Sequence, residues 1–171
     1  MFLLYFSRCF IGIWSHFVSL TFPSIDCAVS SLPSLRIGAD ALELRVDLLE
    51  DNSPSSLHRQ IALLKSVCNL PVVFTVRSKG QIGKYPDNDP EGMFNLLNEG
   101  LRAGCEWIDI EACWDKKLTQ TFIDKLNNEY RCTSRILGSL HKTIPQSRPE
   151  VTALFEATRL NNCAHILKVR D

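Results

Sequence analysis

Residues 42 to 47 alternate apolar and charged side chains, and this alternation constrains the fold more than any other feature of the chain. In a β-strand the apolar residues would occupy one face, and Glu43, Arg45 and Asp47 would occupy the other. The later predicted strands are mostly apolar and are separated by helical patterns, which is typical of a parallel sheet covered by helices. A face open to water is not expected in such a sheet, so we predict that the charges line an enclosed polar cavity. The alternative is an edge strand with a solvated face.

A pattern of strand followed by helix repeats from residue 17 onward. Strands are predicted over residues 17–22, 41–46, 72–77, 107–111, 135–141 and 164–169. Helices are predicted over residues 24–35, from 53 to before Pro71, and over 93–101, 116–130 and 147–160. Strands that alternate with helices in this way indicate successive right-handed βαβ units.

Two α/β architectures accommodate these units. A doubly wound open sheet fits the length of 171 residues, because a complete (β/α)8 barrel usually needs about 250. An incomplete (β/α)8 TIM-type barrel, with about six of its eight βα units, fits the polar residues better, because a barrel brings the carboxyl ends of its strands to one site. These residues are Glu43, Arg45, Arg77, Asp109, Glu111, His141 and Lys168. No glycine-rich phosphate loop follows the first strand, which removes the main reason to prefer a nucleotide-binding sheet.

Residues 1–16 form an atypical apolar N-terminal segment, and residues 17–171 are expected to form one domain. The apolar run in this segment is shorter than the roughly 20 residues that span a bilayer. It also lacks the basic start and the small-residue cleavage site of a signal peptide. The segment either packs against the bottom of the barrel or is an artefact of gene boundaries. We expect a cytoplasmic protein that has no membrane partner.

Charge and cysteine content argue against several classes of function. Lys and Arg together number 19, and so do Asp and Glu. The chain therefore has no net positive charge that would favour direct binding of nucleic acid. The seven cysteines include no Cys-x-x-Cys pair, a pattern that fits neither a disulfide framework nor a zinc site. We expect buried free thiols in a reducing compartment and no bound metal.

Lys168 and His141 are candidate catalytic residues. A lysine between Leu167 and Val169 on an inward-facing strand is costly to bury with its charge, and desolvation favours the neutral, nucleophilic amine. Such an amine condenses with a ketone, and an imidazole such as His141 then removes a proton beside the iminium and protonates a leaving group. This chemistry predicts a Schiff-base lyase or aldolase. The alternatives are a strand-end lysine that reaches solvent and a structural, hydrogen-bonded histidine.

Several segments, in this order along the chain, carry a resemblance to a known family. They are residues 19–22, 38–49, 74–77, 109–111, 136–141 and 167–169. Together they resemble the type I 3-dehydroquinate dehydratase family, and the Glu-Leu-Arg-Val-Asp and Phe-Thr-Val-Arg segments are the most specific. The sequence of these segments most resembles that of the dehydratase domain of the fungal pentafunctional AROM polypeptide and of the homologous domain of the fungal quinate repressor. The resemblance covers the chain from about residue 17 to its end.

The resemblance implies a (β/α)8 barrel that dehydrates 3-dehydroquinate to 3-dehydroshikimate in the shikimate or quinate pathway. The reaction would use a lysine imine and no metal or cofactor. By position, Lys168 would form the imine and His141 would be the general acid and base. The residues implied for substrate binding are Ser19, Glu43, Arg45, Arg77 and Gln81, with Asp109 and Glu111 in the polar shell beneath them.

The chain departs from the family pattern at two places. Leu140 and Lys142 flank His141, where the family usually has His or Tyr before the histidine and Asp or Asn after it. The chain ends just after Lys168, whereas the family continues through two strands that supply an arginine for the substrate carboxylate and a closing loop. A regulatory or metabolite-sensing module like the quinate repressor, or an inactive fragment, is therefore an alternative function. A partner chain or downstream domains that complete the barrel are a further expectation.

Overall fold

The computed structural model describes residues 3–7, 14–141 and 147–170. The strands are β1 (Leu3–Ser7), β2 (Trp14–Leu20), β3 (Ala41–Arg45), β4 (Val72–Thr75), β5 (Trp107–Glu111), β6 (Arg135–His141) and β7 (Ile166–Arg170). The α-helices are α1 (Leu32–Leu35), α2 (Pro54–Cys68), α3 (Pro90–Arg102), α4 (Lys116–Lys125) and α5 (Arg148–Thr158). The short turns are the 3₁₀-helices η1 (Ile25–Ala28), η2 (Val46–Leu48) and η3 (Lys79–Gln81) and the π-helix η4 (Leu126–Tyr130).

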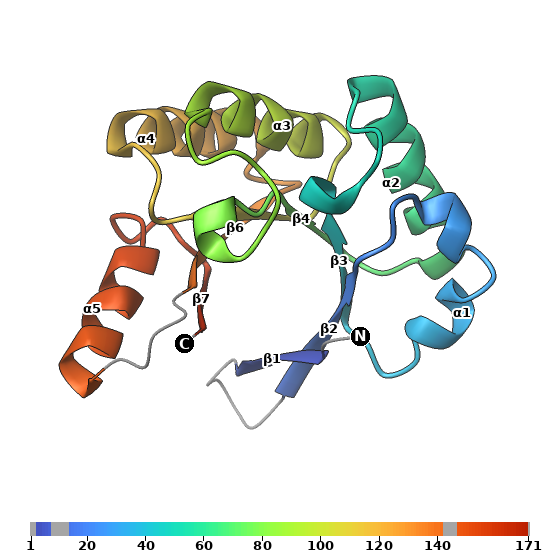
Figure 1. Ribbon diagram of the computed structural model, residues 1–171, viewed down its shortest axis with the longest axis horizontal. Coiled ribbons are helices and arrows are strands. Elements are labelled where there is room, and N and C mark those ends of the chain that lie inside the picture. Colours follow the sequence, from blue (N-terminus) through green and yellow to red (C-terminus); the bar gives the residue numbers. More distant parts are fainter. Residues whose placement is uncertain (1–2, 8–13, 142–146, 171) are drawn as a thin grey trace.

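Strands β2 to β7 are parallel, and each pairs with the next strand along the chain. This sequential order differs from that of a doubly wound sheet, in which the order reverses at a switch point. The strands lie on an arc, and helices α1 to α5 lie on its outer side (Figure 1). In the described part of the chain the edge strands β1 and β7 do not pair with each other. The prediction of an incomplete (β/α)8 barrel is therefore confirmed.

The two faces of the parallel sheet differ in chemistry because side chains alternate along each strand. The outer face is apolar and packs against the helices; its buried residues include Leu42, Leu44, Phe74, Ile108, Ile110 and Ile136. The inner face carries buried polar residues, namely Ser19, Glu43, Thr75, Asp109, Glu111, Ser139 and Lys168. β3 lies between β2 and β4, and Glu43 is only 2% exposed. The alternative of a solvated edge strand is therefore wrong.

Several predicted elements differ from the structure in their extent. The helix predicted over residues 24–35 is replaced by η1 and the short α1, because Pro33 has no N–H to bond a carbonyl of the preceding turn and is tolerated only in the first turn of a new helix. The first parallel strand, predicted over residues 17–22, spans Trp14–Leu20. β3 ends at Arg45, and Asp47 lies in η2 instead of continuing the strand.

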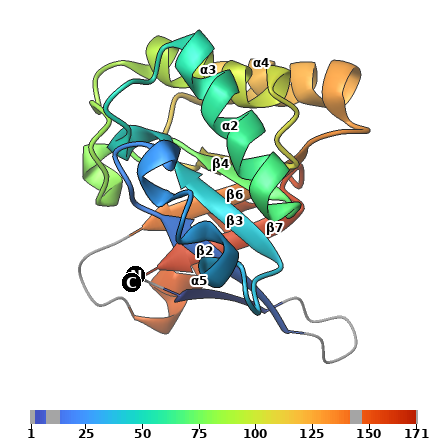
Figure 2. The same ribbon diagram turned by 90° about the vertical axis from the view of Figure 1, so that its right-hand side faces the viewer.

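Part of the N-terminal segment extends the sheet. β1 pairs antiparallel with β2, from Leu3 opposite Val18 to Ser7 opposite Trp14. This pair lies on the side of the molecule opposite to α3 and α4 (Figure 1, Figure 2). No helix in the described ranges is long and apolar enough to cross a membrane.

The six cysteines in the described part of the chain form no disulfide. Cys68 and Cys105 are buried, whereas Cys27, Cys113 and Cys132 are exposed. The prediction of buried thiols is wrong for these three, because they lie in turns and connections on the surface and not in the packed layer between sheet and helices.

Candidate active site

Lys168 on β7 lies in a cluster of side chains from four other strands on the inner face of the sheet. Its Nζ lies 3.1 Å from Oε1 of Glu43 on β3 and 3.8 Å from Oδ2 of Asp109 on β5. The hydroxyl of Thr75 on β4 donates to the same Glu43 oxygen at 2.9 Å. Nζ also lies 5.1 Å from the centre of the Phe17 ring on β2. Lys168 is only 9% exposed, and two carboxylates and an aromatic face offset the burial of its charge.

Arg77, just after β4, contacts the neighbouring carboxylates. Its guanidinium binds Asp109, and Nη1 lies 3.0 Å from Oε1 of Glu111. Nη1 also donates to the hydroxyl of Ser139 at 2.8 Å, and that hydroxyl donates in turn to Asp109. The guanidinium is 3% exposed. Two cations and three carboxylates thus form one buried network, in which each charge has a partner of opposite sign, as buried charges require.

The pKa values in this network follow from burial and from the neighbouring charges. Burial opposes ionisation of Glu43, but the charges of Lys168 and Arg77 and hydrogen bonds from Ser19 and Lys168 outweigh it and lower the pKa of Glu43 to about 2. Burial raises the pKa of Glu111, and the charge of Arg77 offsets only part of this rise. Burial opposes the charge of Arg77, but the surrounding carboxylates raise the pKa of its guanidinium. Glu43 is therefore a fixed negative charge beside the amine.

His141 lies at the end of β6, the strand next to Lys168. β6 and β7 pair Ser139 with Lys168 and His141 with Arg170, so His141 lies one pleat beyond the lysine on the same face. Its side chain is buried. The backbone N–H of His141 donates to Oε1 of Gln81 at 2.5 Å, which joins the end of β6 to the segment after β4.

Ser19 and Arg45 differ in their relation to the network. Ser19 is buried on β2 and makes a hydrogen bond with Glu43. Arg45 binds Asp47 instead, because its Nε and Nη2 donate to Oδ1 and Oδ2 of that carboxylate at 2.9 and 2.8 Å. The structure therefore brings together the predicted site residues on five strands, but it pairs Arg45 with a residue outside the inner face.

Three residues that contribute to this arrangement were not predicted from the sequence: Phe17, Thr75 and Ser139. Thr75 and Ser139 each stand two residues before a predicted site residue, Arg77 and His141, so the period of two along a strand would have found them. Phe17 likewise stands two residues before Ser19 on β2, although its contact with Lys168 depends on how β2 and β7 face each other across the arc.

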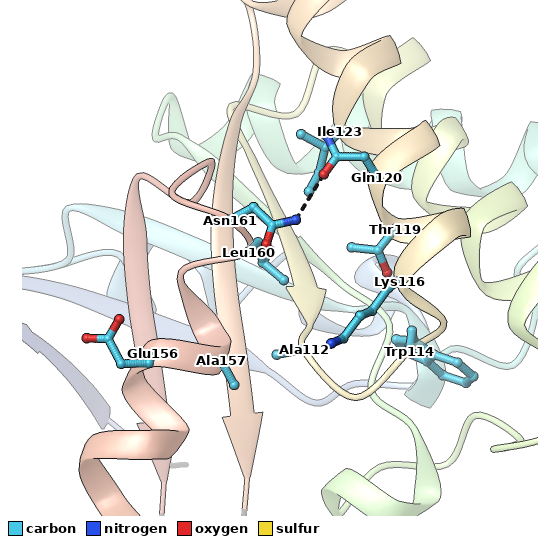
Figure 3. Close-up of a pocket in the computed structure, with 10 residues that line it drawn as sticks. All are labelled: Ala112, Trp114, Lys116, Thr119, Gln120, Ile123, Glu156, Ala157, Leu160 and Asn161. Carbon is cyan, nitrogen blue, oxygen red and sulfur yellow. Dashed lines mark hydrogen bonds between the residues drawn. The ribbon is translucent and has the colours of Figure 1, made fainter.

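A pocket of about 290 Å³ lies outside the arc, between α4 and the end of α5 (Figure 3). Asn161 donates to the amide oxygen of Gln120 at 3.2 Å across it. None of the residues that line this pocket belongs to the network around Lys168. Within the ranges that the structure describes, no group of three His, Cys, Asp or Glu residues is placed to hold a metal ion.

The inner face thus combines three kinds of group. Lys168 supplies a primary amine, the carboxylates around it stabilise positive charge, and His141 places an imidazole on the adjacent strand. These are the groups that condensation with a carbonyl compound and proton transfer beside it require.

A family model described as Type I 3-dehydroquinase matches residues 16–169. Over 133 residues, the chain is 39% identical to a pentafunctional AROM polypeptide of Yarrowia lipolytica, a match that covers 75% of this chain and 8% of that protein. The chain therefore spans only a small part of this relative.

Solved structures show the same arrangement of strands and helices. The structure of the dehydroquinate dehydratase and shikimate dehydrogenase from S. pombe AroM matches with a TM-score of 0.73 and 27% identity, over 91% of this chain and 30% of that one. The structure of 3-dehydroquinate dehydratase from Enterococcus faecalis matches with a TM-score of 0.78 and 19% identity, over 90% of this chain and 64% of that one. The second likeness shows a shared fold.

Proposed function

Because the chain belongs to the type I 3-dehydroquinase family, we propose that it is a 3-dehydroquinate dehydratase that converts 3-dehydroquinate to 3-dehydroshikimate and water through an imine on Lys168. One observation carries the proposal. The amine of Lys168 is buried beside Glu43 and Asp109, one strand away from His141. A residue that only supported the fold would not need a primary amine among carboxylates at this position.

In the proposed reaction, the ammonium of Lys168 first loses a proton, and the neutral Nζ attacks the ketone carbon of 3-dehydroquinate. The released proton and a second proton from Nζ leave with the carbonyl oxygen as water, which gives an iminium. The positive charge stays on the same nitrogen, so Glu43 and Asp109, which pair with the ammonium, also stabilise the iminium. His141 then takes a proton from the adjacent carbon and gives it to the departing hydroxyl, which leaves as water. Hydrolysis of the iminium consumes one water and releases the product, so the net reaction forms one water.

The remaining roles concern substrate binding. We assign contacts with the polar groups of the substrate to Ser19, Glu43, Arg45, Arg77 and Gln81, above a polar shell formed by Asp109 and Glu111. Gln81 supports this assignment, because Oε1 is used by His141, whereas among the residues that the structure describes Nε2 makes only a long contact of 3.5 Å, to the carbonyl of Gly80. We assign to that amide group a hydrogen bond to a substrate oxygen.

The residue before His141 bears on the alternative of a binding module without turnover. Leu140 is buried and, by the alternation along β6, lies on the face of the sheet opposite to His141. It therefore places no apolar side chain beside the imidazole. We include a cytoplasmic location in the proposal, supported by the unpaired cysteines. We also include a partner chain or a further domain that pairs with the edge strand β7 and completes the barrel.

A turnover assay tests the proposal. The product is a conjugated enone, which absorbs ultraviolet light, whereas the substrate is not conjugated in this way. The wild-type chain should form product. Lys168→Ala should form none and keep part of its substrate binding, since the other polar groups remain. Lys117→Ala is the matched control, because this lysine is exposed on α4, and it should behave like wild type. Binding of 3-dehydroquinate without turnover by the wild-type chain would contradict the proposal and favour a metabolite-binding module.

A further inference from the structure

Asp47 follows β3, and its carboxylate is fully buried, with 0% of the side chain exposed. Oδ1 accepts from Nε of Arg45 at 2.9 Å and from the backbone N–H of Arg77 at 3.2 Å. Oδ2 accepts from Nη2 of Arg45 at 2.8 Å and from the backbone N–H of Lys84 at 3.1 Å. Two donors on each oxygen use the full acceptor capacity of a carboxylate. Asp47 therefore joins the end of β3 to the segment that follows β4.

This segment, residues 77–85, is a tight loop that folds back on its own start. The N–H of Tyr85 donates to the carbonyl of Arg77 at 3.0 Å. Gly83 passes so close to that carbonyl that a Cβ on it would lie 2.0 Å from the oxygen. Ile82 has φ = 66°, a left-handed conformation that β-branched residues rarely adopt. Interactions from outside the loop are therefore needed to hold it in this shape, and Asp47 supplies two of them.

The loop contributes two groups to the candidate active site. The guanidinium of Arg77 enters the charged network, and Oε1 of Gln81 accepts from the backbone N–H of His141. Asp47 holds the backbone from which both side chains start. We propose that Asp47 is a positioning residue, whose carboxylate fixes the 77–85 loop so that Gln81 holds His141 at the end of β6. The catalytic consequence rests on the proposed function, whereas the coupling between Asp47 and His141 does not.

Hydrogen exchange at single backbone amides, measured by NMR, tests this coupling. Asp47→Asn preserves the shape of the side chain but leaves one acceptor oxygen in place of two. We expect exchange of the Lys84 and His141 amides to become faster by about tenfold or more. The amides of Ile108 and Ile110, at the centre of the sheet, should keep their rates. Faster exchange at Lys84 with an unchanged rate at His141 would overturn the proposal, and so would equal acceleration at all four amides.

Two further variants separate the steps of the coupling. Gln81→Ala should accelerate exchange of the His141 amide and leave the exchange rate of the Lys84 amide unchanged. This variant removes only the hydrogen bond between Gln81 and His141 and keeps the contacts of Asp47. Asp26→Asn is the matched control, since Asp26 also binds an arginine through two hydrogen bonds, to Arg59, but on the exposed surface. It should change neither amide. A change at His141 in the control would contradict the specific role of Asp47.

The wild-type chain provides a test that does not depend on the folding of D47N. In low concentrations of urea, the Lys84 and His141 amides should exchange through one opening, with the same free energy and the same dependence on urea. Separate openings would overturn the proposal. Because exchange requires no substrate, these results are independent of whether the chain dehydrates 3-dehydroquinate. If it does, D47N should lower kcat by about tenfold with a smaller change in KM, and an unchanged kcat would contradict the catalytic consequence.

Discussion

Replacing Glu43 with glutamine is expected to remove a defined part of the dependence of stability on pH. Although burial opposes its ionisation, Lys168 and Arg77 lower the pKa of Glu43 from 4.5 to about 2. A carboxyl group whose pKa is lower in the folded state stabilises the fold above its unfolded pKa. That stabilisation is lost as the pH falls through the folded pKa. The contribution of Glu43 is therefore complete at neutral pH and decreases between pH 4.5 and about 2.

The size of the effect follows from the shift. One pKa unit corresponds to about 1.4 kcal/mol, so a pKa lowered from 4.5 to about 2 contributes roughly 3 kcal/mol at pH 7. At pH 3 the same group still contributes about 1 kcal/mol, because it is largely ionised in the folded state and largely protonated in the unfolded state. The free energy of unfolding of the wild-type chain should therefore fall by about 2 kcal/mol relative to E43Q between pH 7 and pH 3.

Urea unfolding at a series of pH values, followed by the fluorescence of the three tryptophans, measures this difference. Subtraction of the E43Q values removes the contributions of the titrating groups that both proteins share. Asp26→Asn is the control. The hydrogen bond from Arg59 also lowers the pKa of Asp26 to about 2, but this pair is exposed, so its effect should disappear in high salt while that of Glu43 remains. A difference between wild type and E43Q that is equal at pH 7 and pH 3 would refute the ion pairing of Glu43.

Three other substitutions have expected effects on the free energy of unfolding. Arg77→Met leaves buried carboxylates without their partner and should destabilise the fold by about 3–5 kcal/mol in urea unfolding; a loss below about 1 kcal/mol would show that the network is not buried. Gly100→Ala places a Cβ 2.7 Å from the ring of Phe74 and should cost about 1–3 kcal/mol, whereas an unchanged midpoint would show that α3 and β4 are less closely packed. Ile82→Gly removes the strain of φ = 66° and should raise stability by up to about 1 kcal/mol in thermal unfolding; a loss of stability would show that the isoleucine side chain contributes more than its backbone costs.

Most of the fold was predictable because its strands and helices differ in the period of their apolar residues. The strand over residues 107–111 was predicted with the bounds that the structure shows, since apolar and acidic residues alternate there and Gly104 ends the preceding helix. The segment over residues 24–35 was not predictable in the same way. Ser24 can cap a helix there, and it caps η1, but Pro33 interrupts the backbone hydrogen bonds that would extend this turn into one helix.

The candidate site was predictable to the extent that alternation places a side chain on one face of a strand. This reasoning predicted Glu43, Asp109 and Lys168 as inward-facing residues. It did not predict that Lys168 would pair with Glu43, 125 residues earlier in the chain, because that distance depends on the curvature of the whole sheet. The partner of Arg45 was also not predictable, since the turn η2 directs the carboxylate of Asp47 back toward it.

The most direct test of imine formation by Lys168 is reductive trapping. The purified chain is incubated with 3-dehydroquinate and borohydride, its intact mass is measured, and any adduct is located in the peptides. We expect an adduct on Lys168 in the wild-type chain and in K117A, and none in K168A. A folded wild-type chain that stays unmodified, or an adduct confined to surface lysines, would contradict the imine mechanism.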